Sequence, residues 1–260
     1  MLTKMTEEDW VLVLEVFHAC RSRRGDKGRD DRKFFEALHY FTVHNITWRA
    51  LPAEFGSWNS IWKRFWRLSR SGVFETFFEA LASLSERAHL VQMFDSTVIR
   101  AHVSAAGAKR GQDGEALGRS RGGFSTKIHL KTDLDGYPIG FHLTGGEASD
   151  SRNFEVLLDL GPDVDPRAVV ADKGYDAKTN REAARNRGIC PVIPYRSNTI
   201  DKPKFFAKVL YKARARIEQM MGKIKRFKRI ALRCEKTATN YASFLALVCG
   251  FILIKSVHTA

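Results

Sequence analysis

Apolar residues recur at helical spacing throughout the first 90 residues of the chain. Four stretches follow this spacing, and a polar, charged segment at residues 21–32 separates the first two. Pro52 and Gly56 favour a loop at residues 45–56. The pattern therefore predicts an all-helical N-terminal domain over residues 1–90, with helices at 9–20, 31–45, 57–70 and 72–84.

After residue 90, short β-branched and aromatic runs replace the helical spacing, as is typical of strands. Asp135 and Gly136 join two of these runs and are a strong hairpin signal. A Gly-rich, basic segment at residues 105–123 is predicted to be mobile. The expected order is a strand at 91–102, hairpin strands at 124–133 and 137–146, a helix at 151–160, strands at 165–176 and 190–196 with a helix between them, and a long basic amphipathic helix at 205–233.

This order predicts an α/β domain over residues 91–260, with a mixed sheet flanked by helices. It resembles the order of elements in a ribonuclease H-like fold. The apolar run at residues 242–254 is too short to span a bilayer and is predicted to be a buried core helix. The acidic, polar start of the chain is unlike a secretory signal, so we expect no membrane association.

The four cysteines lie far apart without a Cys-x-x-Cys pair, so neither a disulfide framework nor a zinc cluster is indicated. A reducing cytoplasm is the expected compartment. The histidines lack His-x3-His spacing, and the chain has no Walker loop and no Gly-x-Gly-x-x-Gly motif. Zinc hydrolase chemistry, ATP and dinucleotides are therefore not implied.

The formal charge of +14 indicates an anionic partner, and the excess is uneven. Residues 1–90 are nearly balanced, with 14 Lys or Arg and 12 Asp or Glu. Residues 202–236 carry 13 Lys or Arg against two glutamates. Such a basic stretch favours nucleic acid as the partner; the alternative is a solvated basic helix that faces anionic lipid or only solvent.

Three acidic residues stand out as candidate metal ligands. Asp95 interrupts an apolar strand, where an ionised group is costly unless it is paired or binds a metal. Asp172 ends a buried-type strand, and Glu218 lies among apolar neighbours in the predicted long helix. Three such oxygen ligands suit Mg²⁺ or Mn²⁺. Taken singly, each has a plainer explanation, because a strand-end Asp often caps a turn and a helical Glu often forms an i,i+4 pair.

Around Glu218 the residues read Tyr211-x2-Arg214-x3-Glu218-x6-Lys225. This pattern resembles the Tyr-Arg-Glu-Lys signature of DDE transposases from bacterial insertion sequences of the insertion-sequence-five-like family. The segments DSTVIRAH, GGFSTKIHL, LTGGEASDS, VVADKGYD and RFKRIALRCEKTATNYASF also resemble that family, as does TWRALPAEFGSWNSIWKRFWRLSRSGVFE in the N-terminal region.

The resemblance implies that Asp95, Asp172 and Glu218 are the catalytic carboxylates and hold Mg²⁺ or Mn²⁺, as two ions. It implies that Tyr211, Arg214 and Lys225 contact the phosphates of the cleaved strand. In one continuous helix these three would lie on or near one face with Glu218. Arg216 is the alternative to Arg214 as the arginine of the signature.

The expected activity is metal-dependent cleavage at the ends of an insertion element and attack of the freed 3′-hydroxyl on target DNA. The expected partner is double-stranded DNA, as terminal inverted repeats and target, with a homodimer on paired ends. The expected location is the bacterial cytoplasm, in association with the nucleoid. The alternatives are a hydrolytic nuclease of the same fold and a non-catalytic DNA-binding protein derived from a transposase.

Further basic residues are candidate DNA contacts. Arg64 and Arg67 lie among aromatic residues in the segment SWNSIWKRFWRLSR, which is either a helix that enters a DNA groove or an aromatic core stripe with a basic edge. Lys173 follows Asp172 directly and is a candidate phosphate contact. Lys127 and His129 lie on the strand expected beside Asp95, where a histidine is more often structural.

Overall fold

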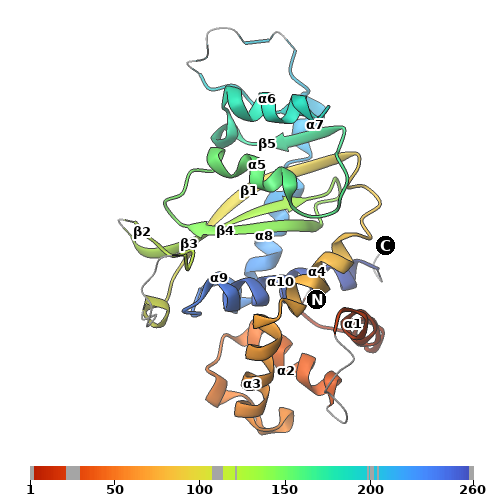
Figure 1. The fold of residues 1–260 in the computed structure, drawn as a ribbon, viewed down its shortest axis with the longest axis vertical. Helices are drawn as coiled ribbons and strands as arrows, with labels where there is room; N and C mark the ends of the chain where they lie inside the picture. Colours follow the sequence, from red (N-terminus) through yellow and green to blue (C-terminus); the bar gives the residue numbers. More distant parts are fainter. Residues whose placement is uncertain are drawn as a thin grey trace. The chain divides into compact units, whose positions relative to one another are not determined.

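The computed structural model describes residues 3–21, 30–106, 114–120, 122–197, 199, 202–203 and 205–257. The chain forms two compact units (Figure 1). The first, here the helical unit, comprises Met1–Leu81, Arg100–Glu115 and Lys223–Ala260. The second, here the sheet unit, comprises Ala82–Ile99 and Ala116–Gly222. Residues 22–29 of the polar segment and residues 107–113 and 121 of the Gly-rich segment lie outside the described residues.

Local capping defines the ends of the first two helices of the N-terminal region. Thr6 and Asp9 form a reciprocal capping box at the start of the first helix. Asp30 accepts a hydrogen bond from the Lys33 amide at the start of the second, which ends at Asn45 in the left-handed conformation. The four predicted helices are confirmed as α1 (Glu7–Cys20), α2 (Asp31–His44), α3 (Trp58–Arg70) and α4 (Val73–Ala82), with 3-10 turns η1 (Trp48–Ala50) and η2 (Ala53–Phe55) between α2 and α3.

The core of the helical unit is aromatic and surrounds α10 (Ala238–Val257). The Phe244 ring of α10 stacks on Phe65 of α3 at 4.3 Å and on Phe41 of α2 at 5.3 Å between centroids. By length and composition α10 could cross a membrane, but 72% of its apolar window is buried inside the protein. The predicted core helix is therefore confirmed.

The sheet unit contains a six-stranded mixed sheet. Neighbouring strands follow the order β2-β3-β1-β5-β6, and β4 also pairs with β3. The β1–β5 and β5–β6 pairs are parallel, whereas β2–β3 and β3–β4 are antiparallel. The strands are β1 (Val91–Arg100), β2 (Gly118–Ser120), β3 (Gly123–Thr132), β4 (Pro138–Gly145), β5 (Ala168–Ala171) and β6 (Cys190–Val192).

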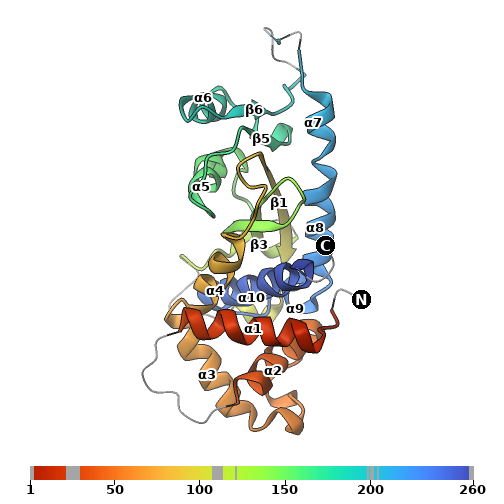
Figure 2. The same cartoon turned by 90° about the vertical axis from the view of Figure 1, so that its right-hand side faces the viewer.

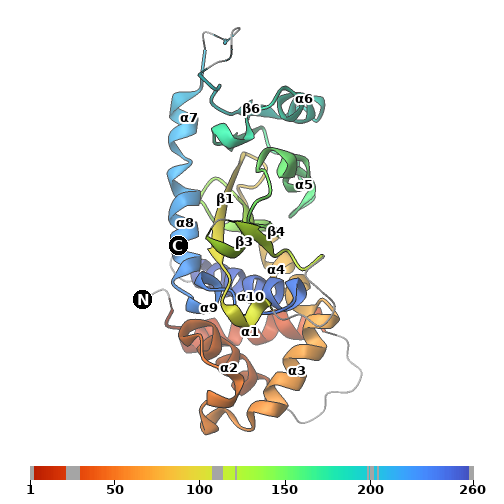
Figure 3. The same cartoon turned by 90° about the vertical axis from the view of Figure 1, so that its left-hand side faces the viewer.

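Helices cover both sides of this sheet. Figures 2 and 3 show α5 (Phe154–Asp159) and α6 (Lys178–Asn186) on one side, and α7 (Lys208–Lys212) and α8 (Ala215–Lys225) on the other. The core on the α5 and α6 side includes Phe94, Phe154 and Tyr175, all fully buried. This mixed sheet with flanking helices is the ribonuclease H-like arrangement that the order of elements predicted.

The predicted long helix at residues 205–233 is wrong in one respect, because three helices occupy this stretch. Between α7 and α8 the chain tightens, so that the Ala213 and Arg214 amides donate to the carbonyls three residues earlier. The stretch breaks again before α9 (Lys228–Ala231), where Phe227 is extended and buried. Its last part, from Lys223, folds with the helical unit.

Candidate active site

Asp172 directly follows the end of β5, and Asp95 lies within β1 at the point where the pairing of β1 with β5 stops. In the parallel β1–β5 pair, Phe94 is the partner of Ala171, and each aspartate is the next residue along the chain. Asp172 is held in place by the Gly174 amide, which donates to its Oδ1 at 2.8 Å. Asp95 Oδ1 accepts from the Ser96 amide, also at 2.8 Å. Carboxyl ends of parallel strands are the usual position of ligand sites in such sheets.

Arg214 connects Glu218 of α8 with Asp95 of β1. Its Nη2 donates to Asp95 Oδ2 at 2.9 Å, and its Nη1 donates to Glu218 Oε1 at 2.6 Å. Because Arg214 lies one turn before Glu218, a single guanidinium reaches both the helix and the strand. Glu218 is exposed, whereas Asp95 is largely enclosed.

Burial raises the pKa of the Asp95 carboxyl, and the negative charge of Asp172 raises it further. The Arg214 guanidinium opposes both effects. Burial also raises the pKa of Tyr175, and the charges of Asp150, Asp95 and Asp172 add to that shift. The Tyr175 hydroxyl is fully enclosed and has no hydrogen-bond partner among the described residues. The buried Tyr175 phenol is therefore close enough to Asp150, Asp95 and Asp172 to respond to their charges.

The donor set is suited to a hard divalent cation, since it consists of carboxylate oxygens. In the part of the chain that the structure describes, no three acidic, imidazole or thiol side chains close on a common point. The Arg214 guanidinium is the cation that pairs with Asp95 and Glu218 here. The residues therefore fit a metal provided that Arg214 releases Glu218 toward the two aspartates.

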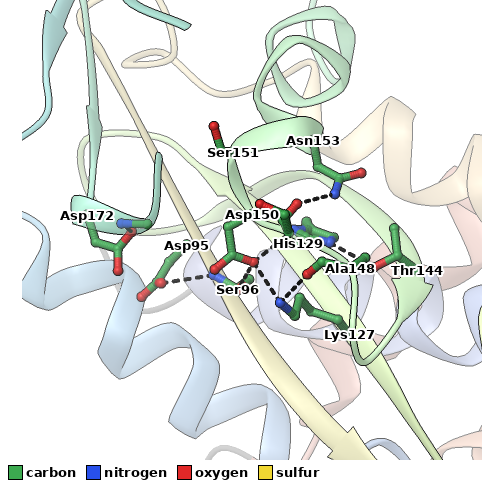
Figure 4. Close-up of polar contacts among 12 residues, drawn as sticks. Asp95, Ser96, Lys127, His129, Thr144, Ala148, Asp150, Ser151, Asn153 and Asp172 are labelled. Atoms are coloured by element: carbon green, nitrogen blue, oxygen red, sulfur yellow. Dashed lines mark hydrogen bonds and ion pairs between the residues drawn. The ribbon is translucent and has the colours of Figure 1, made fainter. Parts of the chain in front are cut away.

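A fourth carboxylate, Asp150, stands beside these residues (Figure 4). Its Oδ1 accepts from the Ser96 hydroxyl at 2.8 Å and from Lys127 Nζ at 3.0 Å. His129 Nδ1 lies 3.8 Å from the same oxygen. Burial lowers the pKa of His129 to about 4, so this contact is not an ion pair at neutral pH. The Nε2 atom of His129 shares a hydrogen bond with the Thr144 hydroxyl at 2.9 Å.

The other residues of the signature are placed along α7 and α8. Tyr211 lies in α7, with its ring 5.4 Å from that of Phe206. Lys225 ends α8 and is exposed. Arg216 donates to the Leu134 carbonyl at 2.7 Å, away from the carboxylates. This contact favours Arg214 over Arg216 as the arginine of the signature.

Two predicted DNA contacts are already engaged within the protein. Arg64 is 5% exposed, pairs with Asp31 and lies over the Phe34 ring. Lys127 Nζ donates to the Ala148 carbonyl at 2.5 Å as well as to Asp150. These partners argue for structural roles in this conformation.

Other basic candidates remain on the surface. Arg67 of α3 and Lys173 of the turn η5 (Lys173–Tyr175) are exposed. In the basic stretch 202–236, Arg229 and Arg233 are buried within the helical unit and cannot face DNA. Lys208, Lys212, Arg226 and Lys228 of the same stretch are exposed.

Sequence reasoning missed Asp150, Ser96 and Tyr175. Asp150 lies in a polar segment after β4, where an aspartate before Ser151 reads as an ordinary turn residue. A usable signal was present for Ser96, because a polar residue directly after Asp95 faces the opposite side of the strand. Nothing in the spacing indicated that Tyr175 is buried near carboxylates.

Comparison with known proteins identifies the family. A model described as "Putative transposase of IS4/5 family" matches residues 5–78, and the "Transposase DDE domain" model matches residues 86–205. The Brucella ovis protein named "Putative transposase for insertion sequence element IS6501" is 36% identical over 50% of this chain and 99% of its own length.

A second relative, the similarly named protein of IS402 from Burkholderia cepacia, is 32% identical over 52% of this chain. The chain spans 65% of the length of that relative. The solved "Mos1 transposase paired-end complex with left transposon end" has a TM-score of 0.27 at 11% identity, over 80% of this chain and 82% of its own, too low to support a conclusion. The two family models and the IS6501 relative show that the chain belongs to the DDE transposases of the IS4/5 family.

Proposed function

We propose that this chain cleaves DNA at the ends of an insertion element and joins the freed 3′-hydroxyl to target DNA. The observation that carries the proposal is that the parallel pairing of β1 with β5 brings Asp95, within β1, beside Asp172, directly after β5, and that Glu218 is tied to Asp95 through Arg214. Dependence on a divalent metal is a general property of the DDE domain.

We propose Mg²⁺ or Mn²⁺, as two ions, with Asp95, Asp172 and Glu218 as the ligands. Bound ions of this kind activate the attacking oxygen and stabilise the leaving oxygen of a phosphodiester. Arg214 provides a guanidinium that can move from Glu218 to a phosphate oxygen, where two N–H groups can bind side by side. Tyr211, Lys225 and Lys173 are the further proposed phosphate contacts.

The proposed partners are the terminal inverted repeats and target DNA, engaged by a homodimer on paired ends in the bacterial cytoplasm, in association with the nucleoid. The proposed functional division is terminal-repeat recognition by residues 1–90 and catalysis by residues 91–260. Arg67 is exposed on α3 and is the better placed of the two arginines proposed there for DNA.

The direct test removes one carboxylate charge at a time from the full-length protein. Asp95→Asn, Asp172→Asn and Glu218→Gln should each lower cleavage and joining of labelled element ends by orders of magnitude, because each removes a charged metal ligand. Binding of the same DNA, measured by gel shift without metal, should survive. Glu182→Gln is the matched control, since Glu182 also pairs with a basic residue four positions earlier in an exposed helix.

The same assays separate the alternatives. Cleavage without joining to a plasmid would indicate a hydrolytic nuclease. Metal-independent DNA binding with no cleavage of any end sequence would indicate a non-catalytic DNA-binding protein. Normal, metal-dependent cleavage by Asp172→Asn would show that this carboxylate is not a ligand.

A further inference from the structure

We propose that Asp150 is a positioning residue that holds Ser96, and through it the Asp95 carboxylate, in the geometry that binds metal. This inference rests on the proposed function, because it concerns the same metal site. Asp150 lies in the turn between β4 and α5, directly before the 3-10 turn η4 (Ser151–Asn153).

The contact between Asp150 and Ser96 links Asp150 to the proposed metal ligand Asp95. The Ser96 hydroxyl donates to Asp150 Oδ1 at 2.8 Å, while the Ser96 amide donates to Asp95 Oδ1 at 2.8 Å (Figure 4). Ser96 is thus fixed by Asp150 on one side and fixes Asp95 on the other. Loss of a group that holds a metal ligand in orientation typically costs about 10–100-fold in metal affinity or activity.

Asp150 is not used in the way its position in the turn would suggest. It occupies the residue before η4, but its side chain makes no capping hydrogen bond. Its Oδ1 instead accepts hydrogen bonds from the Ser96 hydroxyl and the Lys127 ammonium, and the His129 ring lies beside them. A carboxylate that serves only a turn would not need partners on β1 and β3.

The charge of Lys127 explains how a third aspartate is tolerated beside Asp95 and Asp172. The Lys127 side chain is 12% exposed, and its Nζ lies 3.0 Å from Asp150 Oδ1. This pair is close to neutral as a unit, so it adds little repulsion to the two aspartates. The ammonium also donates to the Ala148 carbonyl, which fixes the turn that carries Asp150.

Gly174 allows Asp150 to come near Asp172. A Cβ atom at this position would lie 2.9 Å from Asp172 Oδ1 and 3.3 Å from Asp150 Oδ2. Both carboxylates therefore crowd the same side of one glycine, Asp150 with the oxygen opposite to the one that binds Ser96. This approach places Asp150 at the metal site rather than only beneath β1.

The test measures binding of Mn²⁺ to the protein without DNA, from the electron paramagnetic resonance signal of free Mn²⁺. Asp150→Asn and Ser96→Ala should each raise the Kd for Mn²⁺ by about tenfold or more. Ser96→Thr keeps the hydroxyl and should restore affinity. If Asp150 acts through Ser96, the double variant Ser96→Ala, Asp150→Asn should be little weaker than the weaker single variant.

Asp133→Asn is the matched control, because Asp133 also accepts from a serine hydroxyl, that of Ser85 at 2.6 Å, directly after the end of β3. It should lower stability without changing the Kd for Mn²⁺. If Asp150→Asn binds Mn²⁺ within about twofold of the unmodified protein while Asp95→Asn does not bind, the inference is wrong and the proposed function stands. If the unmodified protein neither binds Mn²⁺ nor cleaves DNA, both are wrong.

Discussion

At the scale of single residues, Arg214 has two roles that a substitution can separate. Without metal it binds both Asp95 and Glu218, so it competes with a cation for two proposed ligands. During the reaction it is proposed to bind phosphate. Arg214→Ala should therefore bind Mn²⁺ as tightly as, or more tightly than, the unmodified protein, and yet cleave about 100-fold more slowly, since a positioned donor to developing charge is lost.

Arg216→Ala is the control for this substitution, because Arg216 bonds the Leu134 carbonyl and none of the carboxylates. It should leave Mn²⁺ affinity and single-turnover cleavage close to those of the unmodified protein. Equal losses of cleavage in the two variants, or weaker Mn²⁺ binding by Arg214→Ala, would contradict the assigned division of roles.

At the scale of elements, the sequence predicted the strands that carry Asp95 and Asp172, because Asp95 interrupts one apolar run and Asp172 ends another. Parallel pairing then brings the two aspartates together, as the Phe94–Ala171 register shows. The position of Asp150 could not be predicted in this way. It depends on the β3–β4 hairpin turning at Gly136, whose φ of 87° favours glycine, and on where the following turn returns to β1.

The breaks in the predicted long helix also lie beyond sequence periodicity. Residues 208–225 keep helical spacing, and a residue such as Arg214 carries no signal for the tightened turn at which it lies. That turn places the guanidinium between Asp95 and Glu218. Tertiary contacts, and not local propensity, therefore determine this part of the site.

Replacing either of two helical glycines by alanine should change the free energy of unfolding, in opposite directions. Gly222 of α8 has open space where a Cβ would lie, whereas a Cβ at Gly250 of α10 would lie 2.5 Å from the buried Phe77 ring. Gly222→Ala should raise the free energy of unfolding by roughly 0.5–1 kcal/mol through helix propensity. Gly250→Ala should lower it by about 1–3 kcal/mol, since the core must shift. Urea denaturation followed by circular dichroism measures both, and a gain in Gly250→Ala would disprove the packing argument.

At the scale of the whole molecule, the helical unit is built from segments that are far apart in the sequence. Residues 223–260 complete the helical unit that residues 1–81 begin, although the sequence offers no break in composition that separates them from the sheet unit. Residues 202–236 are basic on both sides of Lys223, so their composition does not show that the chain passes from the sheet unit to the helical unit there. Buried Arg229 and Arg233 belong to the helical unit, where Arg229 binds Glu235 at 2.5 Å.

A buried histidine, His39, makes the stability of the whole protein sensitive to acid. In the helical unit, His39 packs with its ring centroid 5.2 Å from that of Phe251 and 5.6 Å from that of Trp10. Burial among these rings lowers the pKa of His39 to about 4, from an ordinary value of 6.5. The unfolded chain therefore binds a proton between these two pH values that the folded chain does not. Stability is full above about pH 6.5 and is lost as the pH falls toward 4, by up to roughly 3 kcal/mol.

His39→Gln removes this proton and should flatten the fall in unfolding free energy between pH 6.5 and 4, even if the variant is less stable at neutral pH. His129, whose pKa burial also lowers to about 4, should keep part of the slope, so the acid sensitivity should shrink without disappearing. His102→Gln is the control, because it removes an exposed imidazole instead of a buried one. Urea titrations across this pH range measure the slope. An unchanged slope in His39→Gln, together with an unchanged slope in the control, would mean that carboxylates and not buried imidazoles limit the stability of this protein in acid.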